Sequence, residues 1–395
     1  MKALQKNEPP FRGLRGDALF SSLRTPCYVI DEGALRRNCE KLAAVAAHTG
    51  CKILLAQKAF SNFAFYPLLS RYLAGTEASG LYEARLGAEE MPCGEVHVFC
   101  AAYREDDFEE LLSYADHIVF NSPSQLRAFG ARAKARGKSV GLRVNPECST
   151  QEGHEIYDPC AAGSRLGTTR AVWDREMTDE LVALLDGLHF HTLCEQNADA
   201  LEKTLKAFEE QFSDVLPRMR WLNMGGGHHI TRDDYDTPLL ERLLISARDK
   251  WGVQVYLEPG EAVALNAGYL ATRVLDVVEN GISVAILDAS AACHMPDVIE
   301  MPYTPPLLDV SGEGTFRYRL AGPTCLSGDV VGDYELSGPL SCGDLLVFGD
   351  MAIYTTCKNN TFNGMPLPDI WKLCEEGSLV RLTGFGYENF KRRLG

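Results

Sequence analysis

The chain has 395 residues, 46% of them hydrophobic, and a formal net charge of −15. This length and composition allow a large core, and at about one domain per 150 residues they predict two or three folded units. The negative charge and the lack of a Lys/Arg run argue against nucleic acid or an anionic membrane as a partner. They are compatible with a cationic substrate, although an acidic surface also simply keeps a protein soluble.

The thirteen cysteines show no C-x-x-C spacing, so neither a disulfide framework nor a standard zinc site is predicted, and no metal is expected. The N-terminal stretch MKALQKNEPPFRGLRGDALF has no continuous apolar region, and no run of about 18 uncharged apolar residues occurs. We therefore expect a cytoplasmic protein in a reducing compartment.

Eight short segments with the apolar pattern of buried strands follow one another along the first two thirds of the chain. They are KILLAQK (52–58), AGTEAS (74–79), EVHVFCA (95–101), HIVFNS (117–122), SVGLRVN (139–145), GLHFHTL (187–193), WLNMGGG (221–227) and VQVYLEPG (253–260). Segments with helical apolar spacing lie between most of them, such as ADALEKTLKAFEEQF (198–212) and PLLERLLISARDKW (238–251). This alternation predicts a closed (β/α)8 barrel, with a doubly wound open sheet as the alternative.

After Ala262 the pattern changes to β-branched runs separated by turn signals, as in TRVLDVVENGISVAILDAS. This pattern predicts a mainly antiparallel β domain. We expect residues 35–265 to form the barrel and residues 266–395 the β domain. Residues 1–34, which include the strand-like TPCYVID, are expected to pair with the β domain.

Catalytic residues of such barrels lie at the carboxyl ends of the strands. The predicted strand ends supply Lys58, Ser79, Asn121, Asn145, His191, Gly225, Gly226, Gly227 and Glu258. An amine, an imidazole, three glycines and a carboxylate match the needs of a pyridoxal phosphate site: covalent attachment, a flat group against the ring, N–H groups for the phosphate and an acid for the ring nitrogen. Each has an ordinary structural reading too, such as a solvated lysine, a core histidine or a plain glycine turn.

Motifs spread over nearly the whole chain resemble the fold type III pyridoxal phosphate decarboxylases, the alanine racemase-like enzymes that include ornithine and diaminopimelate decarboxylases. They are TPCYVID, LLAQKAF, SRLG, FHTLCE, NMGGGHH, LEPGEA, GPTCLSGD, GDMAIYT and FNG. Within this family the forms GPTCLSGD, FHTLCE and EPGEA are most similar to carboxynorspermidine/carboxyspermidine decarboxylases. This resemblance, and not the composition, implies a carboxylated polyamine as substrate.

The resemblance also implies roles for individual residues and a homodimer with shared active sites. Lys58 would carry the cofactor, His191 would stack on its ring and Glu258 would bind its ring nitrogen. Gly225 to Gly227 and Tyr354 would hold the phosphate. Cys325 would reach into the site of the other subunit and deliver a proton to the substrate.

Departures from the family pattern bear on the substrate. Glu261 stands where ornithine and diaminopimelate decarboxylases usually have a phosphate-binding arginine, so it must turn away, pair with a cation or serve another role. Cys194 replaces a hydroxyl, and Leu326 replaces an acid that follows the catalytic cysteine. The cationic tail of the substrate then needs other acids, and the candidates are Asp329, Glu195, Glu261 and Asp297.

Other activities remain open from the sequence alone. An ornithine or diaminopimelate decarboxylase and an amino-acid racemase are the nearest enzymatic alternatives. A non-catalytic pyridoxal phosphate-binding protein would share the lysine and the barrel. A metal-dependent hydrolase could instead use His228 and His229.

Overall fold

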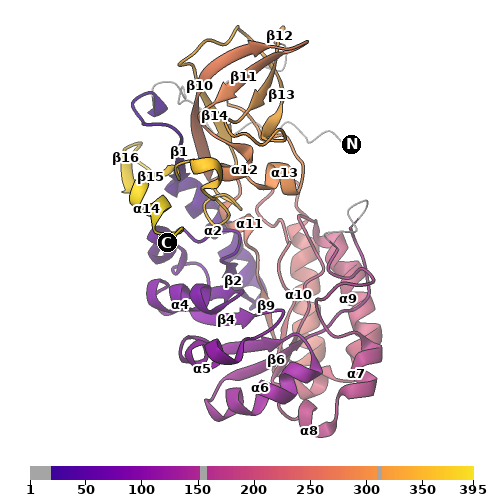
Figure 1. Cartoon of the computed structure of the whole chain (residues 1–395). Helices are drawn as coiled ribbons and strands as arrows, with labels where there is room; N and C mark the ends of the chain where they lie inside the picture. Colours follow the sequence, from indigo (N-terminus) through magenta and orange to yellow (C-terminus); the bar gives the residue numbers. More distant parts are fainter. Residues whose placement is uncertain (1–18, 152–157, 309–313) are drawn as a thin grey trace. The chain divides into compact units, whose positions relative to one another are not determined.

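The computed structural model describes residues 19–151, 158–308 and 314–395. The chain divides into two compact units (Figure 1). The barrel unit comprises residues 36–263, and the β unit comprises residues 264–395 together with the segment up to residue 35.

The barrel unit contains a closed barrel of eight parallel strands in chain order, which confirms the predicted architecture. Each strand falls inside one of the eight segments predicted from the sequence. The strands are β2 (Lys52–Ala56), β3 (Gly75–Ala78), β4 (Glu95–Phe99), β5 (His117–Phe120), β6 (Ser139–Arg143), β7 (Gly187–His189), β8 (Trp221–Asn223) and β9 (Gln254–Leu257). They are shorter than the apolar segments because the last residues of each segment leave the ladder and form the loops at the carboxyl end.

Helices alternate with the strands in this unit (Figure 1). The signals at their ends are local: the Asp236 side chain caps α10 and Gly252, with φ of +66°, ends it. The helices are α3 (Tyr66–Leu69), α4 (Leu81–Glu90), α5 (Glu105–Tyr114), α6 (Pro123–Ala135), α7 (Arg170–Glu176), α8 (Asp179–Val182), α9 (Ala198–Phe212) and α10 (Thr237–Trp251), with 3-10 turns at Phe63–Phe65 and Leu216–Arg218. Two further helices, α2 (Glu32–Thr49) and α11 (Glu261–Ala264), include the points where the chain passes from one unit to the other.

Part of the barrel interior is filled by one large side chain opposite two glycines. A Cβ at Gly141 or Gly187 would lie 2.3 or 2.0 Å from the ring of Trp221. The indole N–H of Trp221 donates to the Ser139 hydroxyl over 2.8 Å, so its polar atom is satisfied. The glycines of β6 and β7 therefore make room for the tryptophan of β8.

The β unit contains a mixed, mainly antiparallel sheet in the order β13-β12-β11-β10-β1-β15-β16, with β14 also paired to β10. Among the described strands of this unit, only the pairs β1/β15 and β11/β12 are parallel. The elements are β1 (Cys27–Asp31), β10 (Gly268–Glu279), β11 (Ser283–Leu287), α12 (Ala291–His294), α13 (Asp297–Glu300), β12 (Phe316–Ala321), β13 (Val330–Leu336), β14 (Leu345–Gly349), β15 (Asp369–Leu373), β16 (Leu379–Thr383) and α14 (Tyr387–Lys391), with a 3-10 turn at Phe362–Gly364. The N-terminal strand β1 lies between β10 and β15, as expected from its sequence.

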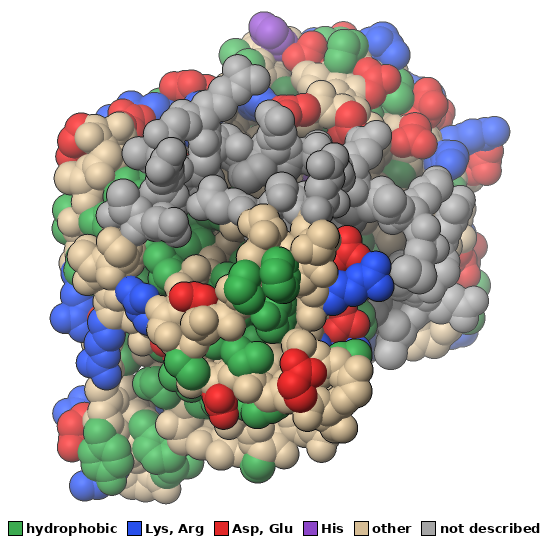
Figure 2. All heavy atoms as spheres, turned by 90° about the horizontal axis from the view of Figure 1, so that it is seen from above, with side chains coloured by type: hydrophobic (Ala, Val, Ile, Leu, Met, Phe, Trp, Pro, Cys, Tyr) green, Lys and Arg blue, Asp and Glu red, His purple; other side chains and the backbone are tan. Residues whose placement is uncertain are grey.

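The surface mixes charges of both signs. On the face seen in Figure 2, Lys and Arg side chains are interspersed with Asp and Glu and with exposed apolar groups. Within the described ranges, no helix has the length and apolar character needed to cross a membrane.

Candidate active site

A cavity of about 300 Å³ opens at the carboxyl ends of the barrel strands. It brings together four residues predicted from the sequence: Lys58, Ser79, His191 and Glu258. The complete lining is Ala56, Lys58, Glu77, Ser79, Phe99, Ala101, Arg143, Arg165, Leu166, His189, His191 and Glu258. The volume suits a small organic ligand, and the lining supplies an amine, imidazoles, carboxylates and guanidinium groups.

The carboxylate of Glu258 is buried and held on both oxygens. Oε2 lies 3.0 Å from Nε2 of His189, and Oε1 accepts a hydrogen bond of 2.6 Å from the amide of Asn223. Burial alone would raise the pKa of Glu258, but the contact with His189 and the hydrogen bond from Asn223 outweigh it and lower the pKa. Glu258 is therefore an ionised carboxylate at neutral pH.

The ring of His191 is fixed by the backbone of the next strand end. Its Nδ1 accepts a hydrogen bond from the N–H of Gly226 over 3.1 Å, so the remaining proton lies on Nε2. Burial, reinforced by the positive charges of Lys58 and Arg143, lowers its pKa well below the usual value. His191 therefore presents a flat, neutral ring to the cavity.

The glycine turn after β8 is required by close packing. A Cβ would lie 2.5 Å from the carbonyl of Phe190 if placed on Gly225, 2.4 Å from that of Glu258 on Gly226, and 2.0 Å from that of Leu193 on Gly227. Gly225 and Gly227 also have φ of +68° and +79°, which favour glycine.

The N–H groups of this turn are partly engaged. Gly225 donates to the side chain of Asn223 over 2.9 Å, and Gly226 donates to His191. The sequence predicts that all three glycines hold a phosphate. Two of their N–H groups, those of Gly225 and Gly226, already donate to acceptors within the barrel unit.

The sequence reasoning missed four polar residues of the cavity: Glu77, Arg143, Arg165 and His189. All but Arg165 stand two residues before a predicted strand-end residue. Because side chains alternate between the two faces of a strand, residues two positions apart point the same way. That periodicity was the signal that could have found these three.

These residues set the charge balance of the cavity. Burial, and then the negative charge of Glu258, raises the pKa of Glu77 well above its usual value, which favours its protonated form. Burial lowers the pKa of Arg143 to about 10, which leaves it cationic. Its guanidinium lies 4.6 Å from the ring centroid of Phe99 and donates to the carbonyl of His191 over 3.0 Å.

A match to a family model identifies the family of this chain. The model described as "Pyridoxal-dependent decarboxylase, C-terminal sheet domain" matches residues 27–352. The chain belongs to the pyridoxal-dependent decarboxylases. It is accordingly an enzyme with pyridoxal phosphate as its cofactor, and the fold of both units is the fold of that family.

Individual relatives are similar over nearly their full length. The chain is 42% identical to the carboxynorspermidine/carboxyspermidine decarboxylase of Campylobacter jejuni, over 95% of this chain and 99% of the relative. It is 39% identical to the carboxyaminopropylagmatine decarboxylase of Synechocystis, over 95% and 97%. The crystal structure of carboxynorspermidine decarboxylase from Campylobacter jejuni complexed with norspermidine matches with a TM-score of 0.86, covering 94% of this chain and all of that one.

The cavity of this decarboxylase fits the cofactor by the chemistry of its lining. Lys58 supplies the amine for covalent attachment, His191 a flat ring fixed in orientation, and Glu258 an ionised acceptor for a protonated ring nitrogen. The metal-dependent hydrolase alternative is excluded by the family. Nor do its two histidines share a partner, since His228 Nε2 lies 3.4 Å from the Met224 carbonyl and His229 faces Glu261.

Glu261 lies beside a histidine of the barrel unit. Its Oε2 lies 3.2 Å from Nε2 of His229, and both side chains are almost buried. Burial lowers the pKa of His229, but Glu261 outweighs burial and the net shift is upward, which favours the cationic form. Pairing of Glu261 with a cation stays a prediction, and this contact supports it. Glu195 is exposed, with φ of +52°, and does not line the cavity.

The other predicted residues lie in the β unit. Cys325 is exposed, and its thiol donates to the side chain of Asn363. Asp297 is paired with Lys358, whose ammonium lies 5.8 Å from the ring centroid of Tyr354.

Asp329 is only 2% exposed, and donors of its own unit surround it. The Ser290 hydroxyl and the Ala292 N–H donate to Oδ1 over 3.0 and 3.2 Å, and the Thr324 hydroxyl donates to Oδ2 over 2.6 Å. A Cβ on Gly322 would come within 2.1 Å of the carboxylate. Substrate binding by Asp329 stays a prediction, and these contacts favour a structural role in the 322–329 loop.

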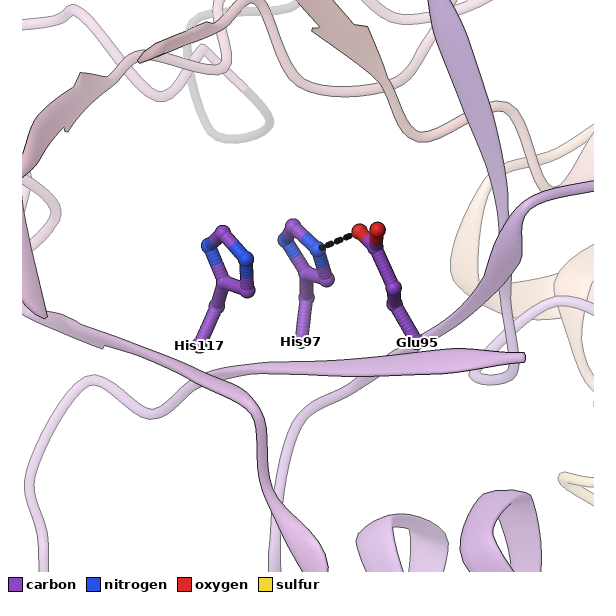
Figure 3. A group of neighbouring side chains, drawn as sticks. All are labelled: Glu95, His97 and His117. Atoms are coloured by element: carbon purple, nitrogen blue, oxygen red, sulfur yellow. Dashed lines mark hydrogen bonds and ion pairs between the residues drawn. The ribbon is translucent and has the colours of Figure 1, made fainter. Parts of the chain in front are cut away.

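A second polar group lies at the amino ends of β4 and β5, away from the cavity. Glu95, His97 and His117 project side by side (Figure 3), with His97 Nε2 3.1 Å from Glu95 and the two rings stacked at 3.9 Å and 9°. Imidazole lone pairs lie in the ring plane, so two parallel stacked rings do not aim them at one point. Glu95 is also ion-paired with Lys52. We therefore assign no metal to this group.

Proposed function

We propose that this decarboxylase removes the α-carboxylate of carboxynorspermidine and carboxyspermidine, giving norspermidine and spermidine. The observation that carries the proposal is the 42% identity to the Campylobacter jejuni enzyme over nearly the whole of both chains. The presence of Lys58, His191 and Glu258 in one cavity supports it chemically.

Three residues of the cavity have defined tasks in this reaction. Pyridoxal phosphate, when bound, would supply an acceptor for the electron pair that stays on Cα as CO2 departs. Lys58 would hold the cofactor through its amine. Glu258, as a carboxylate, would keep a proton on the ring nitrogen, and the neutral ring of His191 would offer a flat contact surface to the cofactor. Glu258 is only 4% exposed, and this burial strengthens its electrostatic effect.

A homodimer with shared sites is part of the proposal. Family resemblance assigns Cys325 of the partner subunit as the proton donor to Cα. Exposed apolar groups near this cysteine support an interface there: Leu326 follows it directly and is 43% exposed, and Phe362, 48% exposed, precedes its hydrogen-bond partner Asn363. We also propose a cytoplasmic location, supported by thirteen cysteines that form no disulfide in the structure, all within the described residues.

The Synechocystis relative favours a second candidate substrate. Its 39% identity is close to 42%, and its name specifies carboxyaminopropylagmatine. This molecule shares the amino-acid end, so the lysine, histidine and glutamate of the cavity act on it in the same way. The two candidates differ only in the cationic tail.

The test is a competition assay that measures kcat/KM for CO2 release. Carboxynorspermidine, carboxyspermidine, carboxyaminopropylagmatine, ornithine and meso-diaminopimelate are compared. We expect one or both carboxylated triamines to exceed ornithine and diaminopimelate by orders of magnitude, because short substrates leave the tail subsite unfilled. A higher value for carboxyaminopropylagmatine would establish the second candidate, and a higher value for ornithine or diaminopimelate would overturn both.

A further inference from the structure

His189 makes the contact that decides the protonation state of Glu258. Its Nε2 and the Oε2 of Glu258 are 3.0 Å apart, and a single proton between them makes the hydrogen bond. If that proton belongs to His189, Glu258 is a carboxylate with lone pairs left for another donor. If it belongs to Glu258, that oxygen is a hydroxyl and the carboxyl group carries no charge.

The surroundings of His189 favour a neutral ring with its proton on Nε2. Its Nδ1 is buried, and no hydrogen-bond partner for it exists among the described residues. A cationic ring would leave an N–H donor there without an acceptor, which is the costlier of the two unsatisfied states. Burial lowers the pKa of His189, and the positive charge of Arg143 opposes protonation further, although Glu258 acts in the other direction.

The ring of His189 is also held in place from the side. It stacks on the ring of Phe99, with centroids 5.5 Å apart and 18° between the planes. Phe99 in turn lies under the guanidinium of Arg143. The second oxygen of Glu258 accepts a hydrogen bond from the side-chain amide of Asn223. The side-chain carbonyl oxygen of Asn223 in turn accepts a hydrogen bond from the backbone N–H of Gly225.

We propose that His189 is a positioning residue, which holds Glu258 ionised and oriented by donating its Nε2 proton, so that Glu258 can keep the ring nitrogen of the cofactor protonated. The proposal rests on the role given to Glu258 under the proposed function, and adds a named residue that acts through it.

The test uses two substitutions of similar size. In His189→Gln the side-chain amide can donate from about the position of Nε2, whereas His189→Leu fills the space without a donor. The control is His117→Leu, which removes a half-buried histidine at the opposite end of the barrel strands. Each holoenzyme is prepared with pyridoxal phosphate labelled with 15N in the ring, and the 15N chemical shift reports the ring protonation directly.

The wild type, His189→Gln and His117→Leu should show a protonated ring nitrogen, and His189→Leu an unprotonated one. The kcat of His189→Leu should fall about ten- to a hundredfold, the range found when the outer hydrogen-bond partner of a functional ligand is removed. The kcat of His189→Gln should stay close to wild type. In the cofactor-free protein, 15N-histidine spectra should show the Nε2–H tautomer for the signal that His189→Gln removes.

Two results would overturn the proposal: a protonated ring nitrogen in His189→Leu, or equal losses in His189→Gln and His189→Leu. Glu258→Gln, measured in the same way, separates this failure from a failure of the underlying assignment. If Glu258→Gln deprotonates the ring and His189→Leu does not, only the role of His189 is wrong. If neither does, the role of Glu258 is wrong as well.

Discussion

The Nδ1 atom of His191 accepts a hydrogen bond from the backbone N–H of Gly226, 3.1 Å away. This contact joins the end of β7 to the glycine turn after β8, so one backbone group sets both the tautomer and the direction of the ring. The orientation of His191 in the cavity thus depends on a turn made of three glycines, Gly225 to Gly227.

Substitution of Gly226 by alanine should weaken cofactor binding. The added Cβ would lie 2.4 Å from the carbonyl oxygen of Glu258, so the turn must move and His191 loses its donor. Strain of about 1–3 kcal/mol corresponds to roughly a five- to 150-fold weaker affinity. Titration of the cofactor-free protein with pyridoxal phosphate, followed by absorbance, measures it. Gly338→Ala, where a Cβ meets no atom within 4 Å, is the control. Equal affinities in both variants would refute the argument.

The sequence predicted those parts of the site that follow from strand order. Lys58, His191 and Glu258 end strands of a parallel barrel, and such ends meet in one place whatever the loops do. His189 could have been found by the same reasoning, because it shares the face of its strand with His191.

Other features depend on pairings that no local pattern specifies. The partner of Glu261 is His229, 32 positions earlier, and the carboxylate of Asp329 receives donors from Ser290 and Ala292. Sequence reasoning placed Asp329 with the substrate because an acid in a family motif carries no sign of its burial. Only the packed structure reveals that neighbouring donors occupy it.

Lys58 should carry the cofactor. Borohydride reduction of the holoenzyme followed by peptide mapping should place the pyridoxyl group on Lys58. Lys52, at the opposite end of the same strand, is the matched control within the chain, since it is ion-paired with Glu95. A label on Lys52 or on any other lysine would contradict the assignment.

Subunit mixing tests the shared site. Lys58→Ala and Cys325→Ala are each expected to be inactive, but random exchange gives half heterodimers, each with one intact site of two. Mixing equal amounts should therefore restore about a quarter of the wild-type activity. Exchange is confirmed with differently tagged chains. Verified heterodimers without activity would show that each site is built from a single chain.

Asp329→Asn separates a structural role from substrate binding. An amide in place of one oxygen would face the hydroxyl and N–H donors that now surround the carboxylate, which should lower the free energy of unfolding by about 1–3 kcal/mol. A structural role predicts the same change of kcat/KM for every carboxylated amine tested. A KM increase confined to substrates with a cationic tail, at unchanged stability, would instead identify Asp329 as a substrate ligand.

His117, which stacks on His97, should make the barrel sensitive to acid. Burial, together with the neighbouring His97, lowers the pKa of His117 to about 3. The unfolded chain has a histidine pKa near 6.5, so between about pH 6.5 and 3 the unfolded state binds the proton and the folded state does not.

Linkage then requires that the stability contributed by His117 be fully present above about pH 6.5 and be lost as the pH falls toward 3. The loss is at most about 1.4 kcal/mol per pH unit for one group. His228 and His294, whose pKa values burial lowers to about 4, and His189 and His191, whose pKa values burial also lowers, add slopes of the same sign. The wild type alone therefore does not isolate His117, whereas His117→Leu removes its contribution and leaves the others. Urea unfolding at pH 8, 6 and 5 should therefore show a smaller loss of stability on acidification in His117→Leu than in the wild type, by up to about 1 kcal/mol between pH 6 and pH 5. Parallel pH dependences in the two proteins would mean that His117 is already protonated in the folded barrel.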